Sequence, residues 1–191
     1  MTIPNIIWLE KVDSTNNEAK RRIGELGHMS VVAAREQTAG RGQRGNTWLS
    51  APGMNLTFSI VLKHGNEGLV DITPDKQFVI NDIISKTIVK FLSRHGISAH
   101  IKLPNDIYVS DKKICGILIE HSVLGSSLVN SIIGVGLNVN QTIFDESLPN
   151  PTSMLLENGI GADDLPSLLQ ELLDIFLKFS KRFVGNIFYK G

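Results

Sequence analysis

Two short segments near the middle of the chain carry a lysine and a polar cluster that together could bind an anion. Residues 102–106 read Lys-Leu-Pro-Asn-Asp, and residues 112–116 read Lys-Lys-Ile-Cys-Gly. Lys113 stands beside a run of Ile and Leu, where a cationic side chain needs either an anionic partner or a route to water. The two segments therefore predict an anion site, provided that the fold brings them together.

The residues between and after these segments predict a hairpin. The proline of the first segment has a fixed φ and no backbone donor, so the chain is extended there and a strand follows at 107–109. Residues 110–112 have the composition of a turn, and 113–120 predict the returning strand. Lys113 is therefore expected beside the asparagine and aspartate of the first segment.

A glycine-rich loop upstream supplies two more cations. Residues 37–48 contain three glycines in a G-x-G-x-x-G pattern, with Arg41 and Arg44 among them. A dinucleotide-binding loop would need a helix directly after this pattern, but residues 55–62 alternate in the manner of a strand. The sequence G-x-x-x-x-G-K-[ST] of a P-loop is also missing. The loop is instead expected to fold over a phosphate, with planar guanidinium donors and glycines that allow close backbone approach.

A third polar segment, residues 13–18, reads Asp-Ser-Thr-Asn-Asn-Glu and follows an expected strand at 6–12. Asp13 or Ser14 is a good N-cap for a helix expected to run to about Leu26. Capping alone explains this composition, and the alternative is that its hydroxyls and amides bind a small polar ring.

In this order the segments resemble the catalytic domain of biotin protein ligases, from about Trp8 to the last expected helix. The matching segments are 13–16, 37–48, 102–106, 113–118 and 134–138. Each motif alone is weak, whereas five in the right order are highly specific. The resemblance implies one catalytic domain over 1–191 of the α/β (α+β) class: a mixed β-sheet flanked by helices, related to class II aminoacyl-tRNA synthetases.

The resemblance implies a two-step reaction with ATP and biotin. The biotin carboxylate attacks the α-phosphorus of ATP to give biotinyl-5′-AMP, and a lysine of a biotin carboxyl carrier protein then attacks this adenylate. Because carboxylate and phosphate repel, Lys113 is expected to contact both and Arg41 to reach the phosphate. Mg²⁺ is expected with the nucleotide, with Asp106 as a candidate helper and no dedicated metal site in the protein.

The resemblance also assigns binding residues. The ureido end of biotin is expected at Ser14, Thr15, Asn16 and Gln37, with the Gly116 backbone close to the ring. The phosphate is expected at Gly40, Arg41, Gly42, Gln43 and Arg44, and the adenylate near Asn105, Asn138 and the Gly134 backbone. Trp48 either covers the ligand or is an ordinary core residue.

Two positions depart from the family pattern. Gln43 stands where many relatives carry a second arginine, and Leu103 replaces a tryptophan. Glutamine has no charge, so the phosphate clamp is expected to be looser unless Arg44 substitutes, and the adenylate to leave faster than from a Gln43→Arg variant. Leu103 is also bulky and apolar, so no change in chemistry is expected there.

Composition limits the remaining functions. The 191 residues carry 19 basic and 19 acidic side chains, which gives no electrostatic case for nucleic acid. Cys115, the single cysteine, fits a reducing cytoplasm and is expected to be a buried apolar residue. With no signal segment, no apolar run of membrane-spanning length and no histidine spacing for zinc, a cytoplasmic protein without membrane partners is expected. The resemblance allows a homodimer, and neither an N-terminal helix-turn-helix domain nor a C-terminal SH3-like domain is expected.

The other expected elements frame these motifs. Strands are expected at 30–34, 56–63, 98–102 and 128–140, with a turn at 123–127. Helices are expected from Thr73–Pro74 to Gly96 and from Asp163 onward, each with an apolar face.

Two other functions remain open. A lipoate ligase or octanoyltransferase of the same superfamily shares the K-x-x-G setting of Lys113, but its loop normally reads R-R-x-x-G-G-G, unlike residues 40–45 here. A non-catalytic biotin or adenylate sensor is the third reading, and the joint presence of Lys113 and Arg41 argues against it.

Overall fold

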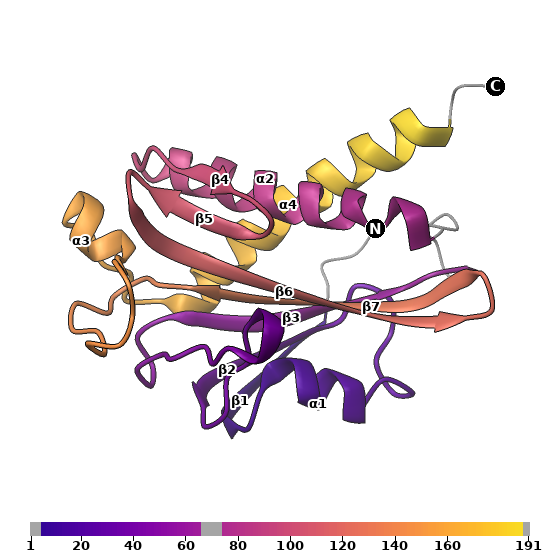
Figure 1. Cartoon of the computed structure of the whole chain (residues 1–191), viewed down its shortest axis with the longest axis horizontal. Coiled ribbons are helices and arrows are strands. Elements are labelled where there is room, and N and C mark those ends of the chain that lie inside the picture. The colour runs from indigo at the N-terminus through magenta and orange to yellow at the C-terminus, as the bar shows by residue number, and fades with distance from the viewer. Residues whose placement is uncertain (1–4, 66–73, 189–191) are drawn as a thin grey trace.

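A seven-stranded sheet organises the part of the chain that the computed structural model describes, residues 5–65 and 74–188 (Figure 1). In spatial order its strands are β1 (Ile6–Val12), β2 (Val31–Gln37), β3 (Leu56–Lys63), β7 (Ser127–Leu137), β6 (Lys112–Leu124), β5 (Asp106–Val109) and β4 (His100–Lys102). β1 and β2 pair in parallel, and the other pairings are antiparallel. The expected mixed sheet flanked by helices is therefore confirmed.

Helices cover both faces of the sheet. The long helices α2 (Phe78–Arg94) and α4 (Leu165–Phe188) pack on one face, and the short α1 (Thr15–Arg21) lies on the other (Figure 1). The single-turn η1 (Gln43–Gly45) and η2 (Pro74–Lys76) and the short α3 (Met154–Asn158) complete the described elements. None of the described helices combines the length and apolarity that crossing a membrane requires.

Side-chain alternation along the strands divides the core in two. On the α2–α4 face, strand residues such as Phe58 and Ile60 pack in the main core. On the α1 face, Val61 and Ile132 pack with Ala19 in a smaller cluster. Because successive strand residues point to opposite faces, Ser59 and Gly134 also face α1. This face therefore has an apolar part and a polar part, and the polar part carries the candidate site.

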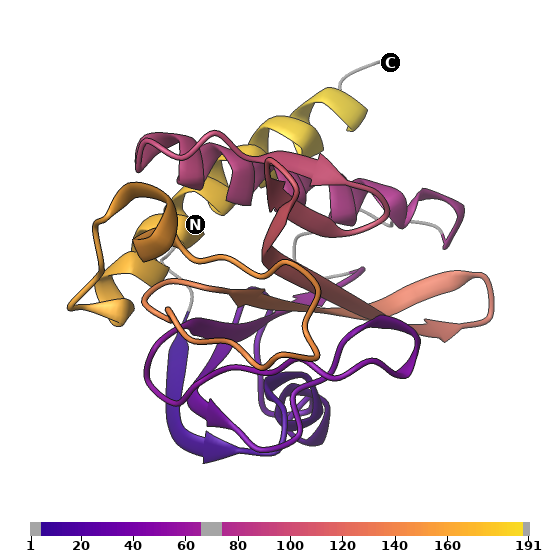
Figure 2. The same cartoon turned by 60° about the vertical axis from the view of Figure 1, so that its left-hand side comes forward.

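The loop after β7 lies beside the loop that precedes β3 (Figure 2). The Asn140 backbone donates to the Met54 carbonyl, and Gln141 accepts from both the Ala51 backbone and the Asn55 side chain. These bonds attach residues 51–55 to the C-terminal half of the chain. Residues 51–55 follow the glycine-rich loop that carries Arg41 and Arg44 (residues 37–48, the arginine loop).

Several expected elements have different ends. The first helix ends at Arg21 rather than Leu26, because the chain turns over the next residues, although Leu26 still packs under the sheet. The strand expected to end at residue 120 continues as β6 to Leu124, and the expected strand 128–140 is β7, which ends at Leu137. Gly125 adopts φ +61°, which permits a two-residue turn and lets the two strands stay paired to their tips.

The second expected helix is also shorter. Pro74 opens the single turn η2, α2 itself starts at Phe78, and Thr73, its expected cap, lies outside the described residues. α2 ends at Arg94, two residues before Gly96, which has φ +76° as expected of a stop.

Candidate active site

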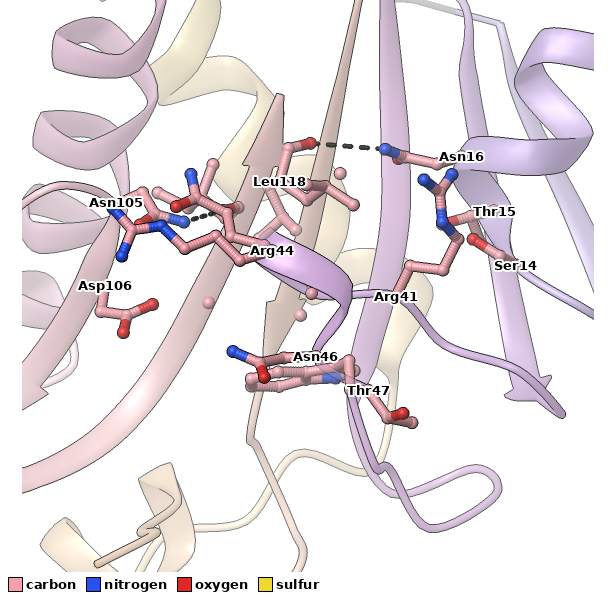
Figure 3. Close-up of a pocket in the computed structure, with 18 of the residues that line it drawn as sticks. Ser14, Thr15, Asn16, Arg41, Arg44, Asn46, Thr47, Asn105, Asp106 and Leu118 are labelled. Carbon is pink, nitrogen blue, oxygen red and sulfur yellow. Dashed lines mark hydrogen bonds between the residues drawn. The ribbon is translucent and has the colours of Figure 1, made fainter. Parts of the chain in front are cut away.

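A cavity of about 220 Å³ opens on the α1 face of the sheet, between the start of α1, the arginine loop and the β5–β6 hairpin (Figure 3). Thirteen of the residues assigned from the sequence line it: Ser14, Thr15, Asn16, Gln37, Arg41, Gly42, Gln43, Arg44, Trp48, Asn105, Lys113, Gly116 and Gly134. Segments that are far apart in the sequence thus meet at one place, as expected.

The start of α1 forms the polar end of the cavity. Ser14 occupies the N-cap position but makes no capping hydrogen bond, so its side chain is not explained by capping. Gln37 Oε1 accepts hydrogen bonds from the Thr15 backbone N–H at 2.8 Å and from Thr15 Oγ1 at 3.2 Å. Asn16 is 3% exposed, and its Oδ1 lies 2.6 Å from Ser59 Oγ. The polar end is therefore buried and held in one arrangement.

Glu120 of β6 joins this end to the arginine loop. Its Oε2 accepts from Asn16 Nδ2 at 2.9 Å and from Arg41 Nη1 at 3.1 Å, and its Oε1 accepts from Arg41 Nη2 at 3.0 Å. Lys20 Nζ donates to Oε1 at 2.6 Å. Burial raises the pKa of Glu120, but the hydrogen bonds from Lys20, Asn16 and Arg41 outweigh it and hold the pKa below its ordinary value. Glu120 is thus an ionised carboxylate with two cationic partners.

Lys113 reaches the cavity through an irregularity in the hairpin. Asp106 pairs with Gly116 and Ile107 with Cys115, but Tyr108 pairs with Lys113, so β6 has one extra residue at this point. As a result, consecutive Ile114 and Cys115 both pack in the main core. Such a bulge changes the facing of the residues beyond it, which puts Lys113 on the same side as Gly116. The K-x-x-G spacing fits the cavity because of this bulge.

Lys113 and Asp106 form an ion pair, with Nζ 2.8 Å from Oδ1, as the predicted hairpin implies. The ammonium also lies 5.7 Å from the centre of the Trp48 ring. Asp106 is therefore engaged by a lysine. No cluster of three or more His, Cys, Asp or Glu side chains suited to a metal occurs within the described residues.

Trp48 packs on a floor made by two glycines of adjacent strands. Gly116 and Gly136 are paired in register, and a Cβ at Gly116 would lie 2.9 Å from the Trp48 ring. A Cβ at Gly136 would overlap the ring outright. The indole Nε1 is buried without a hydrogen-bond partner among the described residues. Trp48 thus lines the cavity in a slot that only glycine permits, rather than packing in the main core.

The two arginines of the loop point to different sides of the cavity (Figure 3). Arg41 lies by Asn16 and also donates to Asn17 Oδ1 at 2.9 Å, whereas Arg44 lies by Asn105. Arg44 itself adopts the left-handed conformation, with φ +55°, within the single turn η1 that follows Arg41.

Gly40 and Asn138 are assigned residues that do not line this cavity. A Cβ at Gly40 would overlap the Trp48 carbonyl oxygen, so this glycine permits the loop to close on itself. Asn138 is buried, donates to the Thr152 carbonyl at 2.9 Å, and borders an adjoining cavity of about 500 Å³. The two cavities share Trp48, Lys113 and neighbouring residues, so Lys113 stands where they meet.

Sequence reasoning missed part of the site. The cavity is also lined by Asn46, Thr47, Pro104, Ile117, Leu118, Val135 and Gly136. Ser59 and Glu120 were missed too, although strand alternation places Glu120 on the face of Leu118 and Gly116, and that signal could have identified it. Cys115 is fully buried, as expected, and burial raises the pKa of its thiol, which keeps it protonated.

Comparison with known proteins identifies relatives over most of the chain. The model of the biotin/lipoate A/B protein ligase family matches residues 8–138. The bifunctional ligase/repressor BirA of Escherichia coli is 32% identical over 83% of this chain and 48% of its own length. The biotin–[acetyl-CoA-carboxylase] ligase of Paracoccus denitrificans is 33% identical over 87% of this chain and 68% of its own.

The structural neighbours agree with these relatives. The biotin protein ligase of Aquifex aeolicus in complex with biotin and ATP superposes with a TM-score of 0.77 at 28% identity, covering 94% of this chain and 71% of that one. The chain spans about half the length of the BirA proteins it matches.

Proposed function

Because the chain belongs to the biotin/lipoate A/B protein ligase family, we propose that it activates biotin with ATP and transfers it to a lysine of a biotin carboxyl carrier protein. The observation that carries this proposal is the position of Lys113. Its ammonium stands between a polar, buried end suited to a small ring and an adjoining cavity with room for a nucleotide. A carboxylate and a phosphate brought together there would meet a fixed positive charge.

In the first step, a biotin carboxylate oxygen bonds to the α-phosphorus while the bond from that phosphorus to the pyrophosphate oxygen breaks. Negative charge builds up on the α-phosphate as the fifth oxygen approaches. Lys113 has three N–H donors, one of which is used by Asp106, so it can donate to carboxylate and phosphate together. Preorganised donors at developing charge are the largest single contribution in many enzymes.

The ureido group of biotin suits the polar end of the cavity. Ser14, Thr15, Asn16 and Gln37 offer both hydrogen-bond donors and acceptors there, and hydrogen bonds hold Thr15, Asn16 and Gln37 in place. An unpaired group at such a buried end costs about 1–3 kcal/mol. Lipoate and octanoate carry no group that would use these side chains, which favours biotin over the lipoate ligase or octanoyltransferase alternative.

The nucleotide is proposed to occupy the adjoining cavity, near Asn138 and Trp48. Asn105 and Gly134, also expected on the adenylate side, line the first cavity instead, where Gly134 lies against Asn16 at the polar end. Mg²⁺ is proposed to enter with it, held by phosphate oxygens, because Asp106 already binds Lys113 and the cavity offers no acidic cluster within the described residues. The bound Mg²⁺ would neutralise the departing pyrophosphate.

The second step needs an acceptor. The lysine amine of the carrier attacks the mixed anhydride, its nitrogen bonds to the biotinyl carbon, and AMP leaves. A biotin carboxyl carrier domain of a carboxylase is the proposed acceptor, which follows from what the Paracoccus relative is named for. A cytoplasmic location and a homodimer stay predictions.

ATP–pyrophosphate exchange with biotin, lipoate and octanoate in parallel tests the first step. Exchange with biotin alone is expected. Exchange with lipoate or octanoate instead would change the substrate while keeping the role of Lys113. Biotin binding without exchange would indicate a sensor. Incorporation of labelled biotin into a purified carrier domain tests the second step.

A further inference from the structure

Glu120 contacts both of the groups that the proposed reaction assigns to opposite ends of biotin. One of its oxygens accepts from Asn16, at the ureido end, and both accept from Arg41, the cation assigned to the phosphate. In this structure, the guanidinium of Arg41 therefore neutralises a carboxylate of the protein instead of facing an anion site.

We propose that Glu120 is a positioning residue: it fixes the amide of Asn16, and it holds Arg41 until an anionic ligand takes the arginine over. The proposal rests on the proposed function, since the ligand is biotin or its adenylate. The shared chemistry of the ligand is an anionic oxygen, supplied by either the carboxylate or the phosphate.

The surroundings of Asn16 support the first part. Glu120 only accepts and takes its hydrogen bond from Nδ2, so a flipped amide would lose this bond and turn its oxygen toward the carboxylate, whereas the Ser59 hydroxyl beside Oδ1 can donate or accept. A Cβ at Gly134 would overlap Asn16 Oδ1, so the backbone beneath leaves no space for another position. Glu120, together with the Leu118 carbonyl that accepts from Nδ2 at 3.4 Å, thus fixes which atoms of Asn16 face the ligand.

The surroundings of Arg41 support the second part. Its side chain is 40% exposed and comes from a glycine-rich loop, so its bond to Glu120 is of the weak, solvent-exposed kind that a ligand can replace. Lys20 also lies 2.6 Å from Glu120, so it can remain paired with the carboxylate when Arg41 leaves. The Glu120 side chain is only 18% exposed, so leaving its carboxylate without a cation would be costly. Lys20 prevents this when Arg41 moves from Glu120 to the ligand.

The test compares the dissociation constants of three ligands by titration calorimetry. Biotin carries a carboxylate, the alcohol analogue of biotin is neutral, and the 5′-adenylate of that alcohol carries one phosphodiester. A Glu120→Gln variant still offers Asn16 an amide oxygen but gives Arg41 no anion. We expect it to bind at least one anionic ligand about two- to fivefold more tightly, the range of an exposed ion pair, and the neutral ligand equally.

Two further variants make the test specific. Lys20→Met removes the other cation from Glu120, so Arg41 is held more tightly and anionic ligands should bind about twofold more weakly. Because Lys20 is exposed, this variant decides the question if Glu120→Gln does not fold. In an Arg41→Met background, adding Glu120→Gln should have no effect on the preference for anions.

The outcomes separate this proposal from the proposed function. If the dissociation constant changes for biotin alone, the biotin carboxylate is the group that Arg41 binds. If it changes for the adenylate alone, the phosphate is that group. Either result supports the proposal. Equal changes for all three ligands, or no change in either variant, would overturn it while leaving the proposed function intact. If the unmodified protein bound none of the three, both would fail.

Discussion

Two cations of the candidate site, Lys113 and Arg41, are each paired with a carboxylate, but the two pairs are built differently. Lys113 and Asp106 lie on adjacent strands of one hairpin, seven positions apart in the chain by their numbers. Arg41 comes from a loop, and its partner Glu120 lies 79 positions further on. Backbone hydrogen bonds between β5 and β6 hold Lys113 beside Asp106. The backbone bonds around Arg41 stay within its own loop, and the bonds that join Arg41 to Glu120 of β6 are made by side chains. We therefore expect Lys113 to act in place and Arg41 to move.

Removing Lys113 should have the largest effect. Lys113→Met takes away the charge at the meeting point of the two cavities, and we expect the rate of biotin-dependent ATP–pyrophosphate exchange to fall by about 100-fold or more. Lys112→Met is the matched control: this neighbour is 54% exposed and 3.8 Å from Glu157, so its loss should change the rate less than about twofold. Similar losses in both variants would show that charge in general, not position, matters.

Arg41→Met should lower activity less than Lys113→Met, since Arg41 must leave Glu120 before it can bind the anionic ligand. We expect kcat/KM for ATP to fall about tenfold. Arg35→Met serves as the control and should be near neutral, because Arg35 lies on β2 and is paired with Glu10 of β1. A loss at Arg41 as large as that at Lys113 would contradict the distinction between a fixed and a moving cation.

The contact between the arginine loop and the sheet can be tested at Gly136, where Trp48 of the loop packs on β7. A Cβ there overlaps the Trp48 ring, so Gly136→Ala should displace the indole and lower the free energy of unfolding by about 1 kcal/mol. The tryptophan emission should shift as the ring becomes exposed. Gly24→Ala is the control, because nothing lies within 4 Å of its added Cβ. Unchanged emission in the Gly136 variant would mean that Trp48 does not rest on the glycine floor in solution.

An added positive charge in the arginine loop should slow the release of the adenylate. Gln43 lines the cavity and carries no charge, so Gln43→Arg should slow release of biotinyl-5′-AMP by about threefold, by the strength of one exposed charge pair. Trapping free adenylate after a single turnover measures this rate. Release from the variant as fast as from the unmodified protein would show that Arg44 already serves as the second cation.

The smallest expected effect is on pH dependence. The pKa of Glu120 is lowered in the folded protein, so its contribution to stability is full above its ordinary value of 4.5 and is lost as pH falls through the lowered folded pKa. Glu120→Gln should therefore flatten the decline of the unfolding free energy below about pH 4.5. Urea titrations at several acidic pH values measure this slope, and an unaltered slope would show that other carboxylates account for it.

The sequence was most informative where the site is local. The proline, the turn residues and the apolar run after Lys113 predict the hairpin, and the hairpin alone brings Lys113 to Asp106. The five motifs, in order, also point to the correct family and to a mixed sheet with helices. The helix after Ser14 was predicted too long because composition does not show where packing against the sheet ends.

Other parts of the site have no local signal. The bulge that turns Lys113 toward Gly116 arises from pairing between β5 and β6, and no residue in the segment requires it. Ser59 and Gly136 read as ordinary strand residues, and their roles appear only when Asn16 and Trp48 are packed against them.

By itself, the sequence determined the order of the elements, the family and which cations stand near polar clusters, because these depend on residue type and on spacing within one motif. Only the tertiary structure decided the partners of those cations. Arg41 binds Glu120, and Trp48 rests on paired glycines, because side chains far apart in the chain compete for the same space and charge once the sheet has formed. Such competition depends on distance in space, which spacing along the chain does not encode.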